Sequence, residues 1–170
     1  MLKRLQFLTS GESHGKGLLG ILDGLPAGIE ISEEYIDHQL KRRQMGHGRG
    51  GRMKIEKDHA QLWGGVRHGL TLGSPVGILI DNLDWKNWTK KMSVEPIQEK
   101  VKPVTLPRPG HADLAGVHKY GFGDIRNILE RSSARETTMR VALGSVCRKL
   151  LEDVGIYIGS RVVQIHNVKD

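Results

Sequence analysis

The sequence has one cysteine, Cys147, among its 170 residues, and no run of apolar residues approaches the ~18 that a membrane-spanning helix needs. A single cysteine excludes an internal disulfide framework and a cysteine-based metal cluster. The first residues include Lys3 and Arg4 but lack the apolar stretch of a secretory signal. These absences predict a cytoplasmic protein with no membrane partner and no bound metal.

Aromatic side chains are also scarce, at 5% of the residues, although the formal net charge is +7. The positive charge favours anionic ligands of any size, including nucleic acid. Nucleic-acid binders interleave basic side chains with aromatic ones, whereas here the basic residues cluster beside glycine and histidine. We therefore expect a small anionic ligand and no nucleic acid, with a basic RNA-binding module as the alternative.

A long helix is predicted towards the end of the chain. Ser133 and Glu136 fit the S-x-x-E capping box, and apolar residues then recur at helical spacing. The helix is expected to begin near Ala134 and to end before Gly155, because glycine is a frequent helix terminator.

The residues before this helix have the chemistry of a phosphate site. Arg131, Ser132 and Ser133 would lie where backbone N–H groups and the helix dipole attract an anion. Arg135 would lie in the first turn and add a guanidinium group, which binds phosphate well. An ordinary helix cap that binds no ligand is the alternative interpretation.

A second basic cluster covers residues 41–54, where arginines and lysines are interspersed with glycines. It follows a short predicted helix that opens at Ser32 and carries Ile36 and Leu40 at i,i+4 spacing. Glycine-rich backbone can approach a small anion closely, and arginines bind phosphate or carboxylate in bidentate fashion. A solvated charge cluster is the alternative. The arginines concerned are Arg42, Arg43, Arg49 and Arg52.

Two histidines are candidates for acid–base chemistry, because histidine titrates near pH ~6.5. His14 stands between glycines directly after a predicted strand, so we expect it on a tight turn that a ligand can approach. His111 follows the stiff sequence Pro-Arg-Pro-Gly. That loop would present Arg108, His111 and Asp113 together, with Asp113 orienting the imidazole.

Residues 11–15 also spell G-x-S-x-G, the pattern of a hydrolase nucleophile elbow. The elbow requires a strand, a sharp turn and then a helix. Residues 16–28 instead contain four glycines and a proline and predict a second strand. A serine hydrolase is therefore a less favoured alternative.

The order of these segments predicts an α+β fold in which antiparallel sheets pack with a helical layer. Two helices interrupt the strand-like runs, and residues 84–104 are lysine-rich without a clear period, so they are expected to form an exposed connection. The whole of residues 1–170 is expected to be part of one domain. The strand-like runs are residues 5–8, 18–22, 62–66, 76–80 and 156–168.

Taken together and in this order, the sequences GESHG, RRQMGHGRGGRM, RPGHAD and RSSARET resemble chorismate synthase of the shikimate pathway. The resemblance covers essentially the whole chain and implies the N-terminal portion, roughly half, of a longer family pattern. The family's later half carries further flavin contacts and a catalytic aspartate with no counterpart here. Residues 127–130 also depart from the glycine-rich stretch of some family members.

The resemblance implies a homotetrameric enzyme that uses reduced FMN to eliminate phosphate from 5-enolpyruvylshikimate 3-phosphate, giving chorismate, and NADPH supplies the reductant in some members. His14 would protonate the departing phosphate, and His111 would interact with N1 of the reduced flavin. The 170-residue chain alone is expected to bind FMN weakly and to be inactive. The implied cofactor-binding residues are Arg131, Ser132, Ser133, Arg43 and Arg49. The implied substrate-binding residues are Arg42, Arg43, Arg49, Arg52, Arg108 and Arg135.

Overall fold

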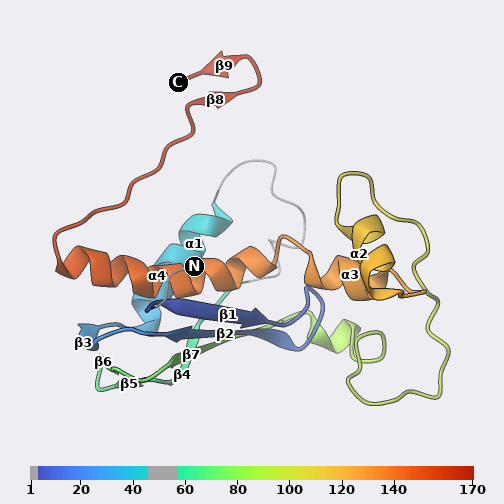
Figure 1. Cartoon of the computed structure of the whole chain (residues 1–170), viewed down its shortest axis with the longest axis horizontal. Helices are drawn as coiled ribbons and strands as arrows, with labels where there is room; N and C mark the ends of the chain where they lie inside the picture. Colours follow the sequence, from blue (N-terminus) through green and yellow to red (C-terminus); the bar gives the residue numbers. More distant parts are fainter. Residues whose placement is uncertain (1–3, 46–56) are drawn as a thin grey trace.

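The computed structural model describes residues 4–45 and 57–170. Its helices and strands confirm the predicted α+β class with antiparallel sheets and a helical layer (Figure 1). The strands are β1 (Gln6–Ser10), β2 (Gly17–Asp23), β3 (Ala27–Glu30), β4 (Gln61–Gly64), β5 (Val66–Arg67), β6 (Leu70–Leu72), β7 (Val76–Asp81), β8 (Gln164–Ile165) and β9 (Val168–Lys169). The helices are α1 (Glu33–Gln44), the short 3-10 helix η2 (Trp85–Asn87), α2 (Asp113–Tyr120), α3 (Arg126–Arg131) and α4 (Glu136–Asp153).

The main sheet has the strand order β1-β2-β7-β4, and all its neighbouring strands are antiparallel. Strands β3, β6 and β5 form a smaller antiparallel sheet. On the two central strands of the main sheet, alternate side chains are buried, including Leu18 and Leu22 on β2 and Ile78 and Ile80 on β7. This alternation, which is visible in the sequence, gives the main sheet one face that needs a cover.

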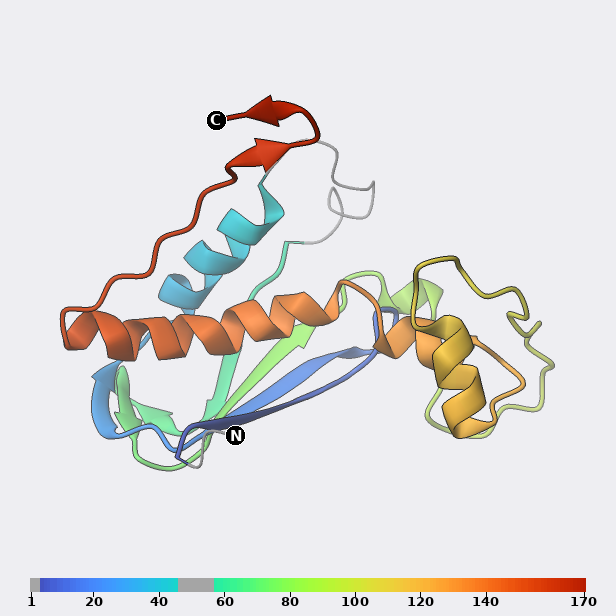
Figure 2. The same ribbon diagram turned by 45° about the horizontal axis from the view of Figure 1, so that its top comes forward.

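Helix α4 lies across that face and α1 packs against α4, so that both helices contribute to the core over the sheet (Figure 2). Helix α1 begins as predicted, because the Ser32 hydroxyl accepts a hydrogen bond from the Tyr35 backbone N–H at 3.1 Å. Ile36 and Leu40 on α1 are fully buried. Helix α4 lies close to β2, where a Cβ atom on Gly20 would come within 2.4 Å of Met139 Sδ. A larger residue at position 20 would therefore force the Met139 side chain to move where this helix crosses the sheet.

The start of α4 differs from the predicted capping box. The helix begins at Glu136 rather than near Ala134, and no side chain caps its first turn. The Ser133 hydroxyl instead donates a hydrogen bond to the Ser13 hydroxyl at 3.1 Å. The same hydroxyl accepts from the backbone N–H of Arg135 at 3.3 Å, whereas a capping box would use the N–H of Glu136. The end of α4 is as predicted, since Gly155 has φ of 78° and follows the last turn in a Schellman motif.

Helices α2 and α3 were missed by the sequence interpretation. They form a lobe beside one end of the sheet, together with the connections around them (Figure 1). The two helices pack closely, because a Cβ atom on Gly116 would lie 2.5 Å from the Ile128 side chain. Helices of eight and six residues give too few turns for a clear apolar period.

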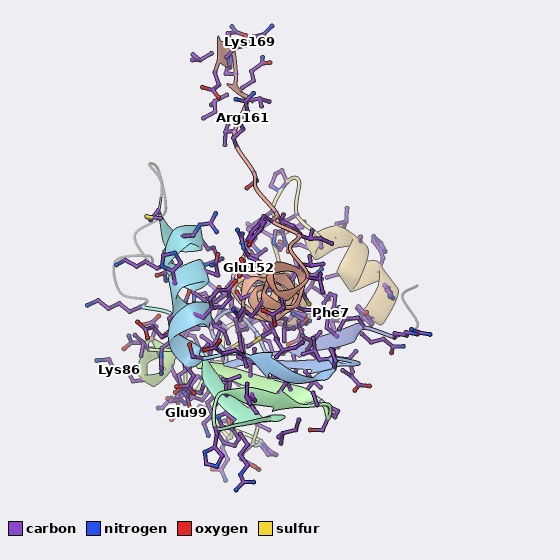
Figure 3. All side chains as sticks on the ribbon, turned by 90° about the vertical axis from the view of Figure 1, so that its left-hand side faces the viewer. Phe7, Lys86, Glu99, Glu152, Arg161 and Lys169 are labelled. Carbon is purple, nitrogen blue, oxygen red and sulfur yellow. The ribbon has the colours of Figure 1, made fainter. Side chains whose placement is uncertain are left out.

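The strand expected over residues 156–168 is wrong for most of its length. Only β8 and β9 form, and they pair with each other as a short hairpin. Figure 3 shows this segment, with Arg161 and Lys169, extending away from the helices and the sheets. The β-branched residues of the segment have strand propensity, but a strand also needs a partner, and no other strand of the described residues lies beside it. No helix in the described part of the chain is both long enough and apolar enough to cross a membrane.

Candidate functional site

His14 lies on the turn that follows β1, as predicted, and its surroundings hold it on two sides. Its Nδ1 is 2.8 and 3.0 Å from the two carboxylate oxygens of Glu130, and its backbone N–H donates to the same carboxylate at 2.9 Å. Trp88 stacks on the imidazole, with ring centroids 3.7 Å apart. The Glu130 side chain is only 1% exposed, whereas 23% of the His14 side chain remains accessible.

The turn that carries His14 is tied to both neighbouring segments of the chain. The Ser13 N–H donates to the Glu130 carbonyl at 2.9 Å, which attaches the turn to the end of α3. The Asn82 side chain donates to the Gly15 carbonyl at 2.7 Å, and this attaches it to the segment after β7. Trp88 is itself fixed, because its indole N–H donates to Asp84 at 2.8 Å. The hydrogen bonds of the turn and of Trp88 therefore fix the position of the imidazole.

Arg131 is the last residue of α3, and Ser132 and Ser133 follow it in the junction between α3 and α4. The Arg131 guanidinium donates to the carbonyl and hydroxyl oxygens of Thr9 at 3.0 and 2.8 Å, and the Thr9 hydroxyl donates to Glu136 at 2.9 Å. Burial raises the pKa of Glu136, but hydrogen bonds from Arg140 and Thr9 outweigh it and set that pKa below its ordinary value. These contacts fix a charged, hydroxyl-rich surface at the start of α4.

A cavity of about 720 Å³ opens beside this junction. Arg131 and Ser132 line it from the junction, and Lys91, Tyr120 and Phe122 line it from the α2 and α3 lobe and the long connection. Neither candidate histidine is among its described lining residues. The cavity is within the size range of small-molecule sites, and it combines cationic groups with aromatic rings.

A second cluster gathers arginines at the start of α4 around one buried carboxylate. Asp58, whose side chain is 1% exposed, lies 3.0 Å from Arg135 and 3.5 Å from Arg43. Arg43 also donates to Thr137 at 3.1 Å and to the Ala134 carbonyl at 3.2 Å. The structure thus brings Arg43 and Arg135 together, although 92 residues separate them in the sequence.

The other predicted arginines are placed differently. Arg42 is exposed on α1 and donates to Gln39 at 2.6 Å. Arg49 and Arg52 lie outside the described residues. The Gln44 side chain donates to Asp58 at 3.0 Å, which ties the described chain before residues 46–56 to the chain after them.

His111 belongs to a third group, at the start of α2. Its Nδ1 contacts Asp113, as predicted, and the Arg108 guanidinium lies 3.0 Å from its Nε2. Asp113 is fully buried and is the first residue of α2 rather than part of the loop. Burial raises the pKa of Asp113, but hydrogen bonds from the Arg108 N–H and from His111 outweigh it and leave that pKa below its ordinary value.

Three of these residues were not found from the sequence. Glu130 and Trp88 hold His14, and Asp58 holds the arginines. The only available signals were that Asp58 closely follows the glycine-rich basic cluster and that Glu130 directly precedes Arg131.

No group of three acidic, histidine or cysteine side chains in residues 4–45 and 57–170 is arranged to hold a metal ion.

The hydrolase alternative is wrong. Ser13 is 5% exposed, and the chain after it enters β2 rather than a helix, so the strand, turn and helix of a nucleophile elbow are not formed.

Comparison with known proteins agrees with the motifs. A family model described as chorismate synthase matches residues 5–170. The chain belongs to the chorismate synthase family. It is 61% identical over 165 residues to chorismate synthase of Aquifex aeolicus and 55% identical over 168 residues to that of Enterococcus faecalis, alignments that cover 96% and 97% of this chain. A crystal structure of chorismate synthase matches all of this chain with a TM-score of 0.77 and 45% identity.

The chain is much shorter than these chorismate synthases. The alignments cover 42% of the Aquifex aeolicus protein, 43% of the Enterococcus faecalis protein and 41% of the chain in the crystal structure. The chain therefore spans about two fifths of the length of the relatives it matches. The comparisons therefore establish the family and the fold of this chain, and they do not by themselves establish the activity of a whole chorismate synthase.

Proposed function

We propose that a protein built on this chain is a carbon–oxygen lyase that converts 5-enolpyruvylshikimate 3-phosphate to chorismate by anti-1,4-elimination of phosphate. The observation that carries the proposal is the contact between the two motif segments that supply its central groups. The Ser133 hydroxyl donates to the Ser13 hydroxyl at 3.1 Å, so the turn with His14 abuts the junction with Arg131. A proton donor and an anion-binding segment lie side by side.

In this proposal the arginines neutralise a substrate that carries one phosphate and two carboxylates. Arg43 and Arg135 share Asp58, so one carboxylate balances two guanidinium groups and the cluster keeps a net positive charge. Their geometry is set before a ligand arrives, which lowers the entropic penalty of binding. The remaining substrate-binding arginines in the proposal are Arg42, Arg49, Arg52 and Arg108.

Reduced FMN is the proposed cofactor, and the described residues fit it. The cavity beside Arg131 and Ser132 offers cationic and hydroxyl groups for a phosphate, and Tyr120 and Phe122 offer aromatic surface for a ring system. Ser133, Arg43 and Arg49 complete the proposed cofactor-binding set. When bound, the reduced flavin supplies the transient electron donation that helps the allylic C–O bond break.

The two histidines have separate proposed roles. His14 donates a proton to the departing phosphate and so stabilises the leaving group. His111 approaches the cofactor, which requires Arg108 to release Nε2, because Arg108 occupies that ring nitrogen at 3.0 Å in the structure. The proposal also includes a cytoplasmic homotetramer, with NADPH as one source of reducing equivalents.

Two proteins test the reaction. One is the 170-residue chain as it stands, and the other is a chimaera in which the remaining sequence of the Aquifex aeolicus relative continues after Asp170. We expect the chimaera to form chorismate anaerobically only when FMN has been chemically reduced. Turnover with oxidised FMN and no reductant, or no turnover under any reducing condition, would count against the proposal. Titration of FMN into the 170-residue chain, followed by flavin fluorescence, is expected to show weak binding and no elimination.

The histidine roles are tested by kinetics in the chimaera. His14→Ala and His111→Ala are expected to lower kcat by about 10²- to 10⁴-fold, because each removes a group that acts in the transition state. Arg43→Ala is expected mainly to raise KM, because it removes a charge-assisted contact worth about 1.5–3 kcal/mol. The reverse pattern, with normal kcat in both histidine variants, would overturn the assignment.

A further inference from the structure

The buried carboxylate of Glu130 is part of neither the sequence motifs nor the proposed reaction. Glu130 is the next-to-last residue of α3, and its side chain is 1% exposed. Burying a carboxylate is unfavourable unless hydrogen bonds and charges compensate for the lost hydration. Here the compensating groups are the ring and the backbone N–H of His14, together with Arg126, whose guanidinium lies 3.9 Å away on the same helix.

We propose that Glu130 is a positioning residue for His14, holding the hydrogen on Nδ1 so that Nε2 is the atom that transfers the proton. The proposal rests on the proposed function, in which His14 protonates the departing phosphate. A neutral imidazole carries one N–H, and an ionised carboxylate only accepts hydrogen bonds. A carboxylate at 2.8 Å from Nδ1 therefore selects the tautomer with hydrogen on Nδ1.

The orientation of the ring follows from the same contacts. Oε2 of Glu130 accepts from both the backbone N–H and Nδ1 of His14, so the main chain and the ring are aligned on one oxygen. Trp88 packs against the face of the ring at 3.7 Å with an interplanar angle of 23°, and this limits rotation of the ring. Within the described residues, no group hydrogen bonds to Nε2 of His14, and 23% of the side chain is accessible.

The proton balance is simple. In the charged imidazole both nitrogens carry hydrogen. The Nε2–H bond breaks, and its proton passes to an oxygen of the leaving phosphate. The Nδ1–H bond stays intact and points at Glu130, whose carboxylate remains ionised throughout. Glu130 therefore touches no substrate, and it acts only by fixing which nitrogen of His14 reacts.

The first test is nitrogen NMR of the 170-residue chain with ¹⁵N-labelled histidine, at a pH where histidines are neutral. The His14 signals are assigned by comparison with His14→Gln. We expect the shifts of the Nδ1–H tautomer in the wild-type chain and a loss of that preference in Glu130→Ala. A wild-type His14 with its hydrogen on Nε2 would overturn the proposal, whatever the variants do.

The second test is kinetics in the chimaera. Glu130→Ala is expected to lower kcat by about 10²-fold with KM within about threefold, because a mis-set proton donor affects the transition state rather than binding. The control is Glu152→Ala on α4, which removes a carboxylate that takes hydrogen bonds from Tyr35 and Arg148, both at 3.0 Å. It should leave kcat within about twofold.

If Glu130→Ala does not fold, the similarly shaped Glu130→Gln decides, with kcat about tenfold lower expected because a neutral amide oxygen accepts weaker hydrogen bonds than a carboxylate does. Unchanged kcat in the folded variant would overturn the proposal. The two inferences fail differently. A chimaera that forms no chorismate while His14 shows the Nδ1–H tautomer refutes the reaction and supports the positioning by Glu130. Chorismate formation with the hydrogen on Nε2 refutes the positioning alone.

Discussion

Replacing Asp58 by alanine is expected to lower the free energy of unfolding by about 3–5 kcal/mol, the range for removing one partner of a buried ion pair. Asp58 and Arg135 have side chains only 1% and 5% exposed, and their charged atoms are 3.0 Å apart. Without the carboxylate, the guanidinium groups of Arg135 and Arg43 would face each other with little water to screen them. Small proteins have about 5–15 kcal/mol of stability, so the loss is a large fraction of the total.

The magnitude is measured by urea unfolding of the 170-residue chain, followed by far-UV circular dichroism. The control is Asp153→Ala, which removes a carboxylate that is 39% exposed and 3.6 Å from Lys149. We expect the control to change stability by less than about 1 kcal/mol, because solvent screens exposed pairs. Asp58→Asn, which keeps the shape without the charge, should fall between the two. A loss below about 1 kcal/mol in Asp58→Ala would refute the view that this carboxylate holds the arginines.

Two further predictions concern packing and pH. Gly20→Ala should lower the free energy of unfolding in urea by about 1–3 kcal/mol, because its Cβ would lie 2.4 Å from Met139 Sδ. The control, Gly144→Ala on α4, should be stabilising, because its Cβ would meet nothing within 4 Å; equal effects of the two changes would contradict the close crossing of α4 over β2. Hydrogen bonding to Asp37 raises the pKa of His59 above its ordinary value, so its stabilising effect is fully present below pH ~6.5 and is lost as the pH rises through the raised pKa. As the pH rises through the raised pKa, the difference in unfolding free energy between wild type and His59→Gln should therefore shrink, and a difference that grows would contradict the predicted direction. Because the His59 side chain is 59% exposed, we expect this difference to be less than about 1 kcal/mol.

The sheet and the two long helices were predictable because their signals are local. Strands β2 and β7 each contain the apolar run expected of them, and the Ser32 cap with Ile36 and Leu40 identifies α1 within a dozen residues. These patterns reflect which face each element buries, and that face is encoded by neighbouring residues. The failed capping box has the opposite origin, because the Ser133 hydroxyl donates to Ser13 and the Glu136 carboxylate accepts from Thr9, both of which are distant in the sequence.

The sequence motifs name the residues of the candidate site but only some of their contacts. The motifs pointed to His14 and Arg135, but nothing near either residue in the sequence identified Glu130 or Asp58 as its partner. The His14–Glu130 contact joins residues 116 apart, and the Arg135–Asp58 contact joins residues 77 apart. Pairing over such separations depends on how the lobe and the sheet come together, which local spacing does not specify. The exception is Asp113, which lies two residues from His111 and was correctly expected to orient it.

The same sequence separations have a consequence for the order in which the protein folds. The turn with His14 is made early in the chain, but the groups that fix it come from the segment after β7, from α3 and from the α3–α4 junction. The nearby contact of Thr9 with Arg131 likewise joins residues 122 apart. Closing such long loops carries an entropic penalty that local helices and hairpins avoid, so contacts of this kind tend to form late. We therefore expect the sheet and α4 to be structured before His14 has its partners. A nascent or partly unfolded chain would have most of its secondary structure before His14 is held by Glu130.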